Sequence, residues 1–457
     1  MNDYDTIAAI STPVGTGGIS IVRLSGEKAF EITEKVFSRP NGKPFSEAGA
    51  NTLSYGHIID TEGSIVDEVL VGKMLAPHTY TTEDTAEINC HGGLFAARSV
   101  LALLLKNGAR AAEPGEFTKR AFLGGRIDLS QAEAVEDIIT SKTELFTKIA
   151  AGQIAGALKN AVSAITDKIL VLLSELEVTI QYPEYDIEEV TVGRLRDSLE
   201  EIRDDIVALG ATYRKGEISR EGLRTVIAGK PNVGKSMLLN RILDEDKAIV
   251  TDIPGTTRDV VDELVNLSGV PVKMMDTAGI RESSEKVEAI GIDRSVAAIK
   301  KADLVLWTVD VSSPLEQEDM RLRAEIAGKP FFAVLNKCDL GINKDTLDYF
   351  RDDEYIICSA RTGENIDKVT GAIADFAMDS PGDITSAALI VNARHKALID
   401  KAAEAIGHAI VSLDGGMPED LIEIDINDCR DYLGEITGET AREDVIDEIF
   451  SRFCLGK

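Results

Sequence analysis

A short run at the middle of the chain has the residue types and spacing that bind the phosphate groups of a nucleotide. Residues Gly229–Ser236 read GKPNVGKS and follow an apolar stretch that ends at Ala228. Glycines allow successive backbone N–H groups to face a phosphate, the lysine bridges the β- and γ-phosphates, and the serine hydroxyl binds Mg²⁺. The run therefore predicts a phosphate-binding loop whose contacts are Gly229, Asn232, Val233, Gly234, Lys235 and Ser236.

Three later motifs each end an apolar stretch and complete a guanine-nucleotide site. Residues 276–279 (DTAG) supply a carboxylate for the Mg²⁺ shell, through water, and a backbone N–H for the γ-phosphate. Residues 336–339 (NKCD) end in a carboxylate that accepts hydrogen bonds from guanine N1–H and N2–H₂, an edge that adenine lacks. Residues 359–361 (SAR) offer backbone N–H groups to guanine O6. These motifs predict GTP and GDP as ligands, with contacts at Asp276, Gly279, Asn336, Lys337, Asp339, Ser359, Ala360 and Arg361.

A threonine-rich segment lies between the first two motifs, where the first switch loop of a GTPase belongs. Residues 251–259 read TDIPGTTRD, and either Thr256 or Thr257 is expected to bind Mg²⁺ when GTP is present; a plain turn is the alternative. Ile280 follows the DTAG motif where many small GTPases have the glutamine that orients the attacking water. An apolar side chain cannot do this, so another residue must. The candidates, each otherwise a solvated charge, are Arg281, Glu282, Glu285 and Glu288.

Alternating strands and helices are predicted to position these motifs. Short apolar runs between about residues 222 and 376 are mostly separated by helical stretches, which is typical of a doubly wound, mostly parallel sheet. The carboxyl ends of such strands form a ligand crevice, and the motifs stand at those ends. The predicted strands are Leu223–Ala228, Val272–Asp276, Leu304–Asp310, Phe331–Asn336 and Tyr355–Cys358.

Helical periodicity occupies both flanks of this region. Apolar residues recur in steps of four and three from Leu158 to Leu176 and from Leu195 to Leu209, on either side of an acidic turn with a proline, which predicts an antiparallel helix pair. Residues 130–133 (SQAE) form a capping-box pattern that predicts a helix start. The periodicity returns between residues 391 and 436. We therefore expect an α/β domain inserted into a helical domain whose two halves share one core.

The first 120 residues mix the two patterns and predict an α+β domain. Strands are expected at Ile19–Leu24, Val66–Met74 and Ala86–Cys90, and a helix at Leu94–Lys106. The predicted organisation is an α+β domain (residues 1–120), a first helical half (121–215), an inserted GTPase domain (216–378) and a second helical half (379–457).

Composition restricts the location and partners of the protein. The 78 acidic residues against 49 basic ones give a net charge of −29, so we expect weak binding to nucleic acid by the chain alone, since phosphate backbones are bound by neutralising them. Five scattered cysteines without a CxxC pair, and the lack of an export signal, predict reduced thiols and a cytoplasmic location. No uninterrupted apolar run reaches 18 residues, so no membrane span is expected.

Over essentially its whole length the chain resembles the MnmE (TrmE) family of tRNA modification GTPases. The resemblance rests on the GKPNVGKS, TDIPGTTRD and DTAGIR runs, on residues 114–122 (PGEFTKRAF) and 126–134 (RIDLSQAEA), and above all on the terminal FCLGK. It implies a homodimer that acts with an FAD-dependent partner, MnmG, on the wobble uridine of certain tRNAs. The implied product carries a carboxymethylaminomethyl or aminomethyl group, whose carbon comes from 5-formyl- or 5,10-methylene-tetrahydrofolate.

The resemblance also assigns residues to hydrolysis. It implies a K⁺ ion between two GTPase domains, held by Asn232 and capped by the loop residues Thr251, Ile253 and Thr256. This ion would stabilise charge as an arginine finger does in other GTPases. Glu288 matches the water-orienting glutamate of the family, which answers the gap left by Ile280, and Arg281 matches a supporting position.

A folate site in the N-terminal domain is implied as well, because that domain resembles the folate-binding fold of aminomethyltransferases. The matching positions are Arg23, Glu87, Arg126 and Lys457, although the residues alone indicate strand-end surface charges at the first two. Two positions depart from the family, since Thr82 and Cys90 replace glycines and are expected to add bulk near the pocket; Arg126 stands where lysine is frequent.

Two questions stay open at the level of sequence. Cys454 is either a nucleophile that reaches a neighbouring active site or an incidental thiol in a tail held by Phe453. The protein itself is alternatively a regulatory or ribosome-assembly GTPase that acts only as a binding switch. Such relatives usually have a second GTPase domain or a basic RNA-binding module at the carboxyl end, whereas the chain after residue 385 is acidic and helical.

Overall fold

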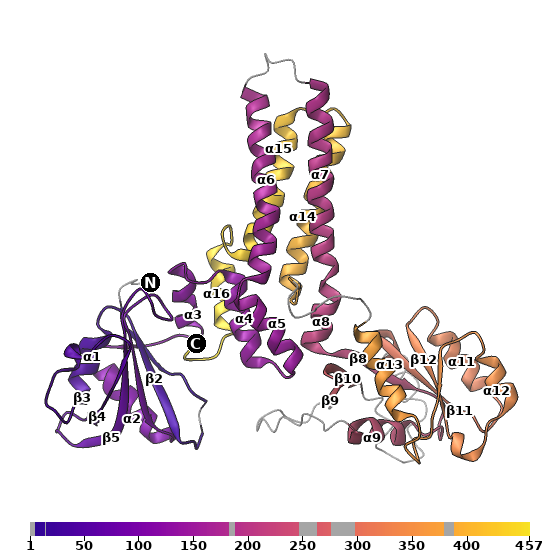
Figure 1. The fold of residues 1–457 in the computed structure, drawn as a ribbon, viewed down its shortest axis with the longest axis horizontal. Coiled ribbons are helices and arrows are strands. Elements are labelled where there is room, and N and C mark those ends of the chain that lie inside the picture. Colours follow the sequence, from indigo (N-terminus) through magenta and orange to yellow (C-terminus); the bar gives the residue numbers. More distant parts are fainter. Residues whose placement is uncertain (1–4, 14, 182–187, 246–262, 276–297, 379–387) are drawn as a thin grey trace. The chain divides into compact units, whose positions relative to one another are not determined.

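The structure is a computed structural model of the 457-residue chain, and it describes residues 5–13, 15–181, 188–245, 263–275, 298–378 and 388–457 (Figure 1). Packing divides the chain into two compact units. The first comprises Met1–Ile139, Gln153–Ile202 and Glu404–Lys457, and the second Thr140–Gly152 and Arg203–Ala403. The domain boundaries predicted at residues 120, 215 and 378 stay predictions.

A seven-stranded sheet forms the N-terminal part of the first unit. Its order is β3-β4-β5-β6-β2-β1-β7, and all neighbours are antiparallel except β1 and β7. Helices α1 (Ala29–Val36) and α2 (Leu94–Lys106) cover one face, where alternate strand residues are buried. The predicted α+β pattern is confirmed. The strands are β1 Ile7–Ile10, β2 Ile19–Ser25, β3 Phe37–Ser38, β4 Thr52–Ile59, β5 Ile65–Met74, β6 Thr85–His91 and β7 Arg110–Ala111.

Two long helices confirm the predicted antiparallel pair. All the apolar residues of the two predicted stripes are buried in α6 (Ala157–Gln181) and α7 (Glu188–Ala211). Ion pairs join Lys168 to Glu201 at 2.5 Å and Glu175 to Arg194 at 3.4 Å. A later residue of α6 therefore pairs with an earlier residue of α7, as antiparallel helices require. Helix α6 also packs on α15 (Glu419–Thr437), as expected for helices from both sides of an insertion that share a core.

Shorter helices complete the helical part: α3 Glu116–Leu123, α4 Leu129–Thr140, α5 Glu144–Ile154, α8 Tyr213–Glu221, α14 Ala393–Asp414 and α16 Glu443–Ser451. The capping box predicted at residues 130–133 is wrong by two positions. The Asp128 carboxylate accepts from the Gln131 N–H at 2.8 Å, and the Gln131 side chain accepts from the Asp128 N–H at 3.0 Å. A carboxylate caps a helix start at least as well as a hydroxyl, so Asp128 takes the position. No helix in the described ranges is long and apolar enough to cross a membrane.

The second unit contains a six-stranded sheet in the order β13-β12-β11-β8-β10-β9, parallel except for the β9–β10 pair. This confirms the predicted doubly wound, mostly parallel sheet. The strands are β8 Leu223–Ala228, β9 Glu263–Leu267, β10 Val270–Met275, β11 Leu304–Asp310, β12 Phe331–Asn336 and β13 Tyr355–Ile357; the helices are α9 Lys235–Glu245, α11 Gln317–Glu325, α12 Lys344–Tyr349 and α13 Ile366–Met378.

The hairpin strand β9 was not among the predicted strands. Ser268 and Gly269 join it to β10 with φ of 51° and 91°, the positive values of a two-residue hairpin turn. The Ser-Gly pair between apolar runs was the available signal.

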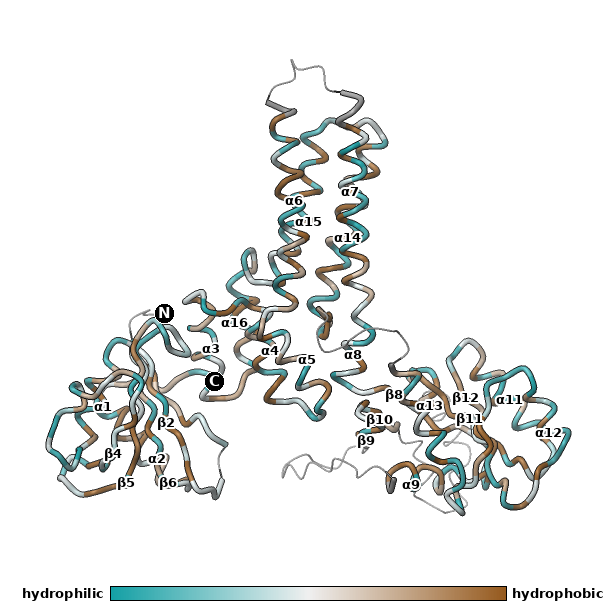
Figure 2. The backbone as a smooth tube through the Cα atoms, viewed as in Figure 1, coloured by the Kyte–Doolittle hydropathy of each residue, from teal (hydrophilic) through white to brown (hydrophobic). Residues whose placement is uncertain are grey.

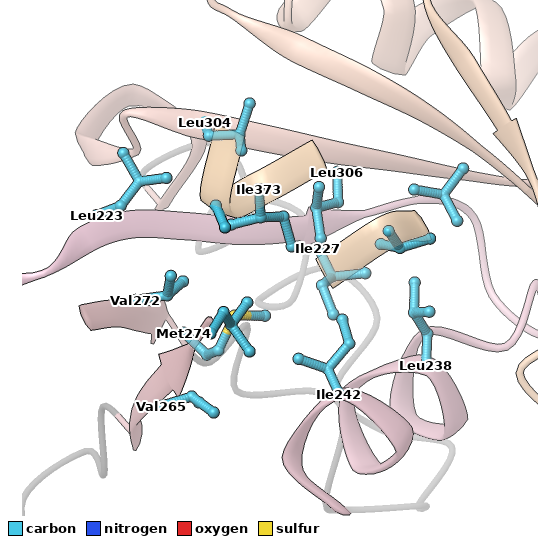
Figure 3. Packing of buried hydrophobic residues seen from close by; sticks show 14 of the residues in the cluster. Leu223, Ile227, Leu238, Ile242, Val265, Val272, Met274, Leu304, Leu306 and Ile373 are labelled. Carbon is cyan, nitrogen blue, oxygen red and sulfur yellow. The ribbon is translucent and has the colours of Figure 1, made fainter. Parts of the chain in front are cut away.

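Apolar side chains from strands and helices meet on one face of this sheet. Ile227, Met274 and Leu306 lie against Leu238 and Ile242 of α9 (Figure 3). The central strand β11 is hydrophobic along its length, as its colour in Figure 2 shows. This core fixes the strands, and so fixes the loops at their carboxyl ends.

Candidate guanine-nucleotide site and a charged cluster around Tyr80

The phosphate-binding loop joins β8 to α9 and has the backbone that the motif predicts. Asn232 and Gly234 have φ of 64° and 99°, the left-handed values that turn successive amides to one side. A Cβ on Gly234 would lie 2.3 Å from the Asn336 Nδ2 atom, and one on Gly229 would lie 2.4 Å from the Thr308 carbonyl oxygen. Both glycines are therefore required by close neighbours as well as by the ligand.

Lys235 points its amine back over this loop. Its Nζ atom donates to the carbonyl oxygens of Gly229 at 2.7 Å and Lys230 at 2.8 Å. Burial lowers the pKa of Lys235, and the negative charge of Glu318 opposes that shift. An anionic phosphate beside the amine would stabilise its charged form, which is the role predicted for this residue.

The Asn336 side chain holds three predicted motifs together. Its Nδ2 donates to the Val233 carbonyl at 2.7 Å, and its Oδ1 accepts from the Ala360 N–H at 2.9 Å. It is 2% exposed, so both bonds are shielded from water. The phosphate-binding loop, the NKCD motif and the SAR motif thus meet at the carboxyl ends of β8, β12 and β13, as the sequence predicted.

Asp339 and Lys337 have different environments. Asp339 has its side chain 16% exposed, and its Oδ1 accepts from the Ser359 hydroxyl at 2.7 Å, which orients the carboxylate predicted to bind guanine. Lys337 Nζ lies 2.7 Å from the Asp310 carboxylate. Burial raises the pKa of Asp310, but hydrogen bonds from Lys337 and Ser312 outweigh it and the pKa is lowered. Arg361 is mostly exposed, with its guanidinium 4.0 Å from Asp339.

Ten candidate residues lie outside the described ranges, so their expected roles stay predictions. They are Thr251, Ile253, Thr256, Thr257, Asp276, Gly279, Arg281, Glu282, Glu285 and Glu288. Within the described part, Ser236 lies in the first turn of α9, and Asn232 is exposed in the loop before it. A hydroxyl oxygen suits Mg²⁺ and an exposed amide or carbonyl oxygen suits K⁺, so both residues fit the ions expected of them.

Three of the four residues implied for folate gather around one aromatic ring in the N-terminal sheet. Arg23 of β2 faces Glu87 of β6 in the strand register, with Nε 2.8 Å from the carboxylate. The guanidinium groups of Arg23 and Arg126 lie 5.2 Å and 4.6 Å from the Tyr80 ring centroid, and that of Arg23 lies 5.6 Å from Phe117. Arg23 is only 15% exposed, so the surface-charge interpretation is wrong for it.

This cluster of charged and aromatic side chains contains a buried donor without a partner. In the described part of the chain, no acceptor lies within hydrogen-bond distance of Arg23 Nη1, which is shielded from solvent. Buried guanidinium nitrogens are normally satisfied, so the atom fits a ligand that brings an acceptor such as a carboxylate. Tyr80 supplies a ring face beside it and was missed, because nothing in sequence separates it from other tyrosines.

The carboxyl-terminal tail lies against the same domain. The Phe117 N–H donates to the Lys457 carbonyl at 3.2 Å, and a Cβ on Gly456 would lie 2.3 Å from the Ile10 carbonyl oxygen. Phe453 is buried with Phe450, as expected for a tail held by Phe453, while Cys454 is exposed. The role of Cys454 stays a prediction.

The two departures from the family differ in outcome. Cys90 is buried in the core on the helix-covered face, where its thiol donates to the Ser20 carbonyl at 3.3 Å and burial raises its pKa to about 11. Because side chains alternate along a strand, Cys90 points to the opposite face of the sheet from Glu87. The expectation that Cys90 adds bulk near the folate site is therefore wrong. Thr82 has φ of 67°, an unusual value for a β-branched residue and one that a glycine adopts freely.

Comparisons with known proteins agree with this architecture. Residues 129–454 match the model of the MnmE helical domain, and residues 6–126 match that of the GTP-binding protein TrmE N-terminus. The chain is 48% identical over 462 residues to the tRNA modification GTPase MnmE of Geobacillus kaustophilus, and 46% identical over 461 residues to that of Acetivibrio thermocellus, covering 100% of each chain.

A solved structure of Era with MgGDPNP and part of 16S ribosomal RNA is 25% identical, at a TM-score of 0.26, over 40% of this chain and 65% of that one. The family models and the full-length relatives decide the assignment. The chain belongs to the MnmE (TrmE) family of tRNA modification GTPases.

Proposed function

We propose that this GTPase is activated by K⁺ and, with an FAD-dependent partner of the MnmG type, forms the 5-carboxymethylaminomethyl or aminomethyl group on the wobble uridine of tRNA from a one-carbon folate. The observation that carries the nucleotide half is the Asn336 side chain, which bonds to both Val233 and Ala360. Asn336 thereby joins the phosphate-binding loop to the SAR motif, which is proposed to contact guanine.

Each residue of the nucleotide site has a distinct task in this proposal. Lys235 neutralises the β- and γ-phosphates, and Asp339 reads the guanine edge. Ser236, with Thr257 and Asp276, would hold Mg²⁺, which supplies charge neutralisation at the phosphates. Asn232 and the 251–256 loop would hold K⁺.

The water attack is assigned to a side chain beyond the described ranges. Glu288 would accept a hydrogen bond from the attacking water and orient it, with Arg281 in support. This glutamate takes the task for which Ile280 has no polar atom.

The folate half of the proposal is supported by the ring and charges around Tyr80. Glu87 can accept from the N–H donors of a pterin, and the unpartnered Arg23 Nη1 beside it can donate to an acceptor atom of the same ligand. Arg126 and the terminal Lys457 add positive charge for the glutamate tail of the folate.

The expected partners follow from charge and family. We propose a homodimer, a basic or FAD-dependent partner that helps to hold tRNA, and a cytoplasmic location. The net charge of −29 opposes strong tRNA binding by this chain alone.

The modification state of tRNA tests this function. In cells lacking the protein, mass spectrometry of wobble uridines should show loss of the aminomethyl-type nucleosides. The intact gene should restore them and a Glu288→Ala gene should not. Unchanged wobble uridines would reject tRNA modification and favour a GTPase that acts only as a binding switch.

Folate binding is tested separately by titrating the full chain with 5-formyltetrahydrofolate. Arg23→Met should weaken binding at least tenfold, because a hydrogen bond between charged groups is worth about 1.5–3 kcal/mol. Arg98→Met, at an exposed position of α2, is the matched control and should bind as the wild type does. Equal affinity of the two variants would remove Arg23 from the folate site.

A further inference from the structure

Arg241 of helix α9 makes two hydrogen bonds to the loop that is predicted to contact guanine. Its Nε donates to the Ala360 carbonyl at 3.2 Å, and its Nη2 donates to the Arg361 carbonyl at 3.1 Å. Two nitrogens of one planar guanidinium therefore hold two consecutive carbonyls, which fixes the orientation of this loop as well as its position.

The helix that carries Arg241 begins at the phosphate-binding loop. Lys235 and Ser236 stand in its first turn, and Arg241 lies six positions after Lys235 in the same helix. Its inner face is anchored in the core of the sheet by Leu238 and Ile242, both 0% exposed. The helix is thus a rigid link between the phosphate side and the base side of the site.

Two further hydrogen bonds connect the loop 359–361 to the NKCD motif. The Ala360 N–H donates to Asn336 on one side, while the Ala360 carbonyl accepts from Arg241 on the other. The Ser359 hydroxyl in turn orients the Asp339 carboxylate. Movement of the loop would displace both the amides facing guanine O6 and the carboxylate facing its N1–H and N2–H₂ edge.

We propose that Arg241 is a positioning residue for guanine recognition, which holds loop 359–361 in register with the bound nucleotide. The proposal rests on the guanine contacts proposed for Asp339 and residues 359–361. It assigns Arg241 to affinity for the base and not to the chemical step, because within the described ranges its hydrogen bonds go to residues 360 and 361 and none goes to the phosphate-binding loop.

Two substitutions separate geometry from charge. Arg241→Ala removes both bonds and the charge, whereas Arg241→Lys keeps the charge but has a single ammonium in place of a planar fork. The control is Arg351→Ala in the same domain, whose guanidinium pairs at 3.0 Å with the exposed Asp348. Thermal unfolding of all three variants shows whether the domain stays folded.

Affinity and turnover are then measured on the full chain. Fluorescent GDP titration should show roughly tenfold weaker binding for both Arg241 variants, since two hydrogen bonds are lost or misaligned. The KM for GTP should rise by the same factor, while kcat at saturating GTP stays within about twofold. The Arg351→Ala variant should match the wild type.

Three results would overturn the proposal. These are wild-type affinity in Arg241→Ala, wild-type affinity in Arg241→Lys (which would assign the effect to charge), and a fall in kcat at unchanged GDP affinity. Failure of the wild-type chain itself to bind GDP would instead reject the guanine site, so the two failures are distinguishable.

Discussion

Replacing Asp339 by alanine should nearly abolish affinity for guanine nucleotides while leaving the fold intact. Asp339 lies in the short turn after β12 with its side chain 16% exposed, and the Ser359 hydroxyl donates to its Oδ1 at 2.7 Å. A carboxylate oxygen has two lone pairs, so both oxygens can still accept from the N1–H and N2–H₂ groups of guanine.

The size of the effect follows from the two lost bonds. Each hydrogen bond to a charged group is worth about 1.5–3 kcal/mol, so their sum is about 3–6 kcal/mol. This corresponds to a loss of GDP affinity on the order of 10²- to 10⁴-fold. The lysine and the amides of the phosphate-binding loop do not contact the base, so their contribution should remain.

Fluorescent GDP titration of the full chain is the assay. Asp345→Ala is the matched control, because Asp345 is an exposed acidic residue in the first turn of α12 of the same domain. A loss below tenfold for Asp339→Ala, or an equal loss in the control, would refute the assignment. An Asp339→Asn variant should gain affinity for xanthosine diphosphate, whose C2 carbonyl can accept from the new amide.

Other residues carry independent predictions. Glu288→Ala should abolish GTP hydrolysis at nearly unchanged GTP affinity, and a large fall in affinity would remove Glu288 from the role of orienting water. Replacing KCl by NaCl should lower turnover by about tenfold or more, since one charge-stabilising group is worth several kcal/mol; equal turnover would count against a K⁺ ligand at Asn232. The free energy of unfolding of Thr82→Gly should be about 1 kcal/mol higher than that of Thr82→Ala, because only glycine adopts φ of 67° without steric strain from a Cβ atom. Equal free energies of unfolding in chemical denaturation would refute this.

The sequence predicted the parts of the nucleotide site that depend on local order. The phosphate-binding loop and the NKCD and SAR motifs each follow a strand, and parallel strands bring their ends to one edge of the sheet. Their convergence at one edge of the sheet was therefore expected. The individual bonds of the Asn336 side chain to Val233 and Ala360 were not expected, because they depend on packing between strands that are far apart in the sequence.

Other features required the structure because sequence patterns leave several options open. Asp128 and Ser130 both offer a capping oxygen, and only the backbone conformation selects Asp128. Arg23 is a charged residue on a strand. Its burial depends on pairing with the strand of Glu87 and on contact with Tyr80, and both residues lie some sixty positions later in the chain. Arg241 sits on a helix with no motif of its own, and its link to loop 359–361 spans 119 positions.

Nucleotide selectivity is the most direct measurement of the central claim that three strand-end loops form one guanine-binding site. Calorimetric titration of the purified, folded chain with GDP and with ADP should show GDP binding and ADP affinity lower by on the order of 10³-fold or more, because adenine leaves the Asp339 carboxylate unpaired. Equal affinity for both nucleotides, or no binding of GDP by a chain with native circular dichroism, would contradict the account.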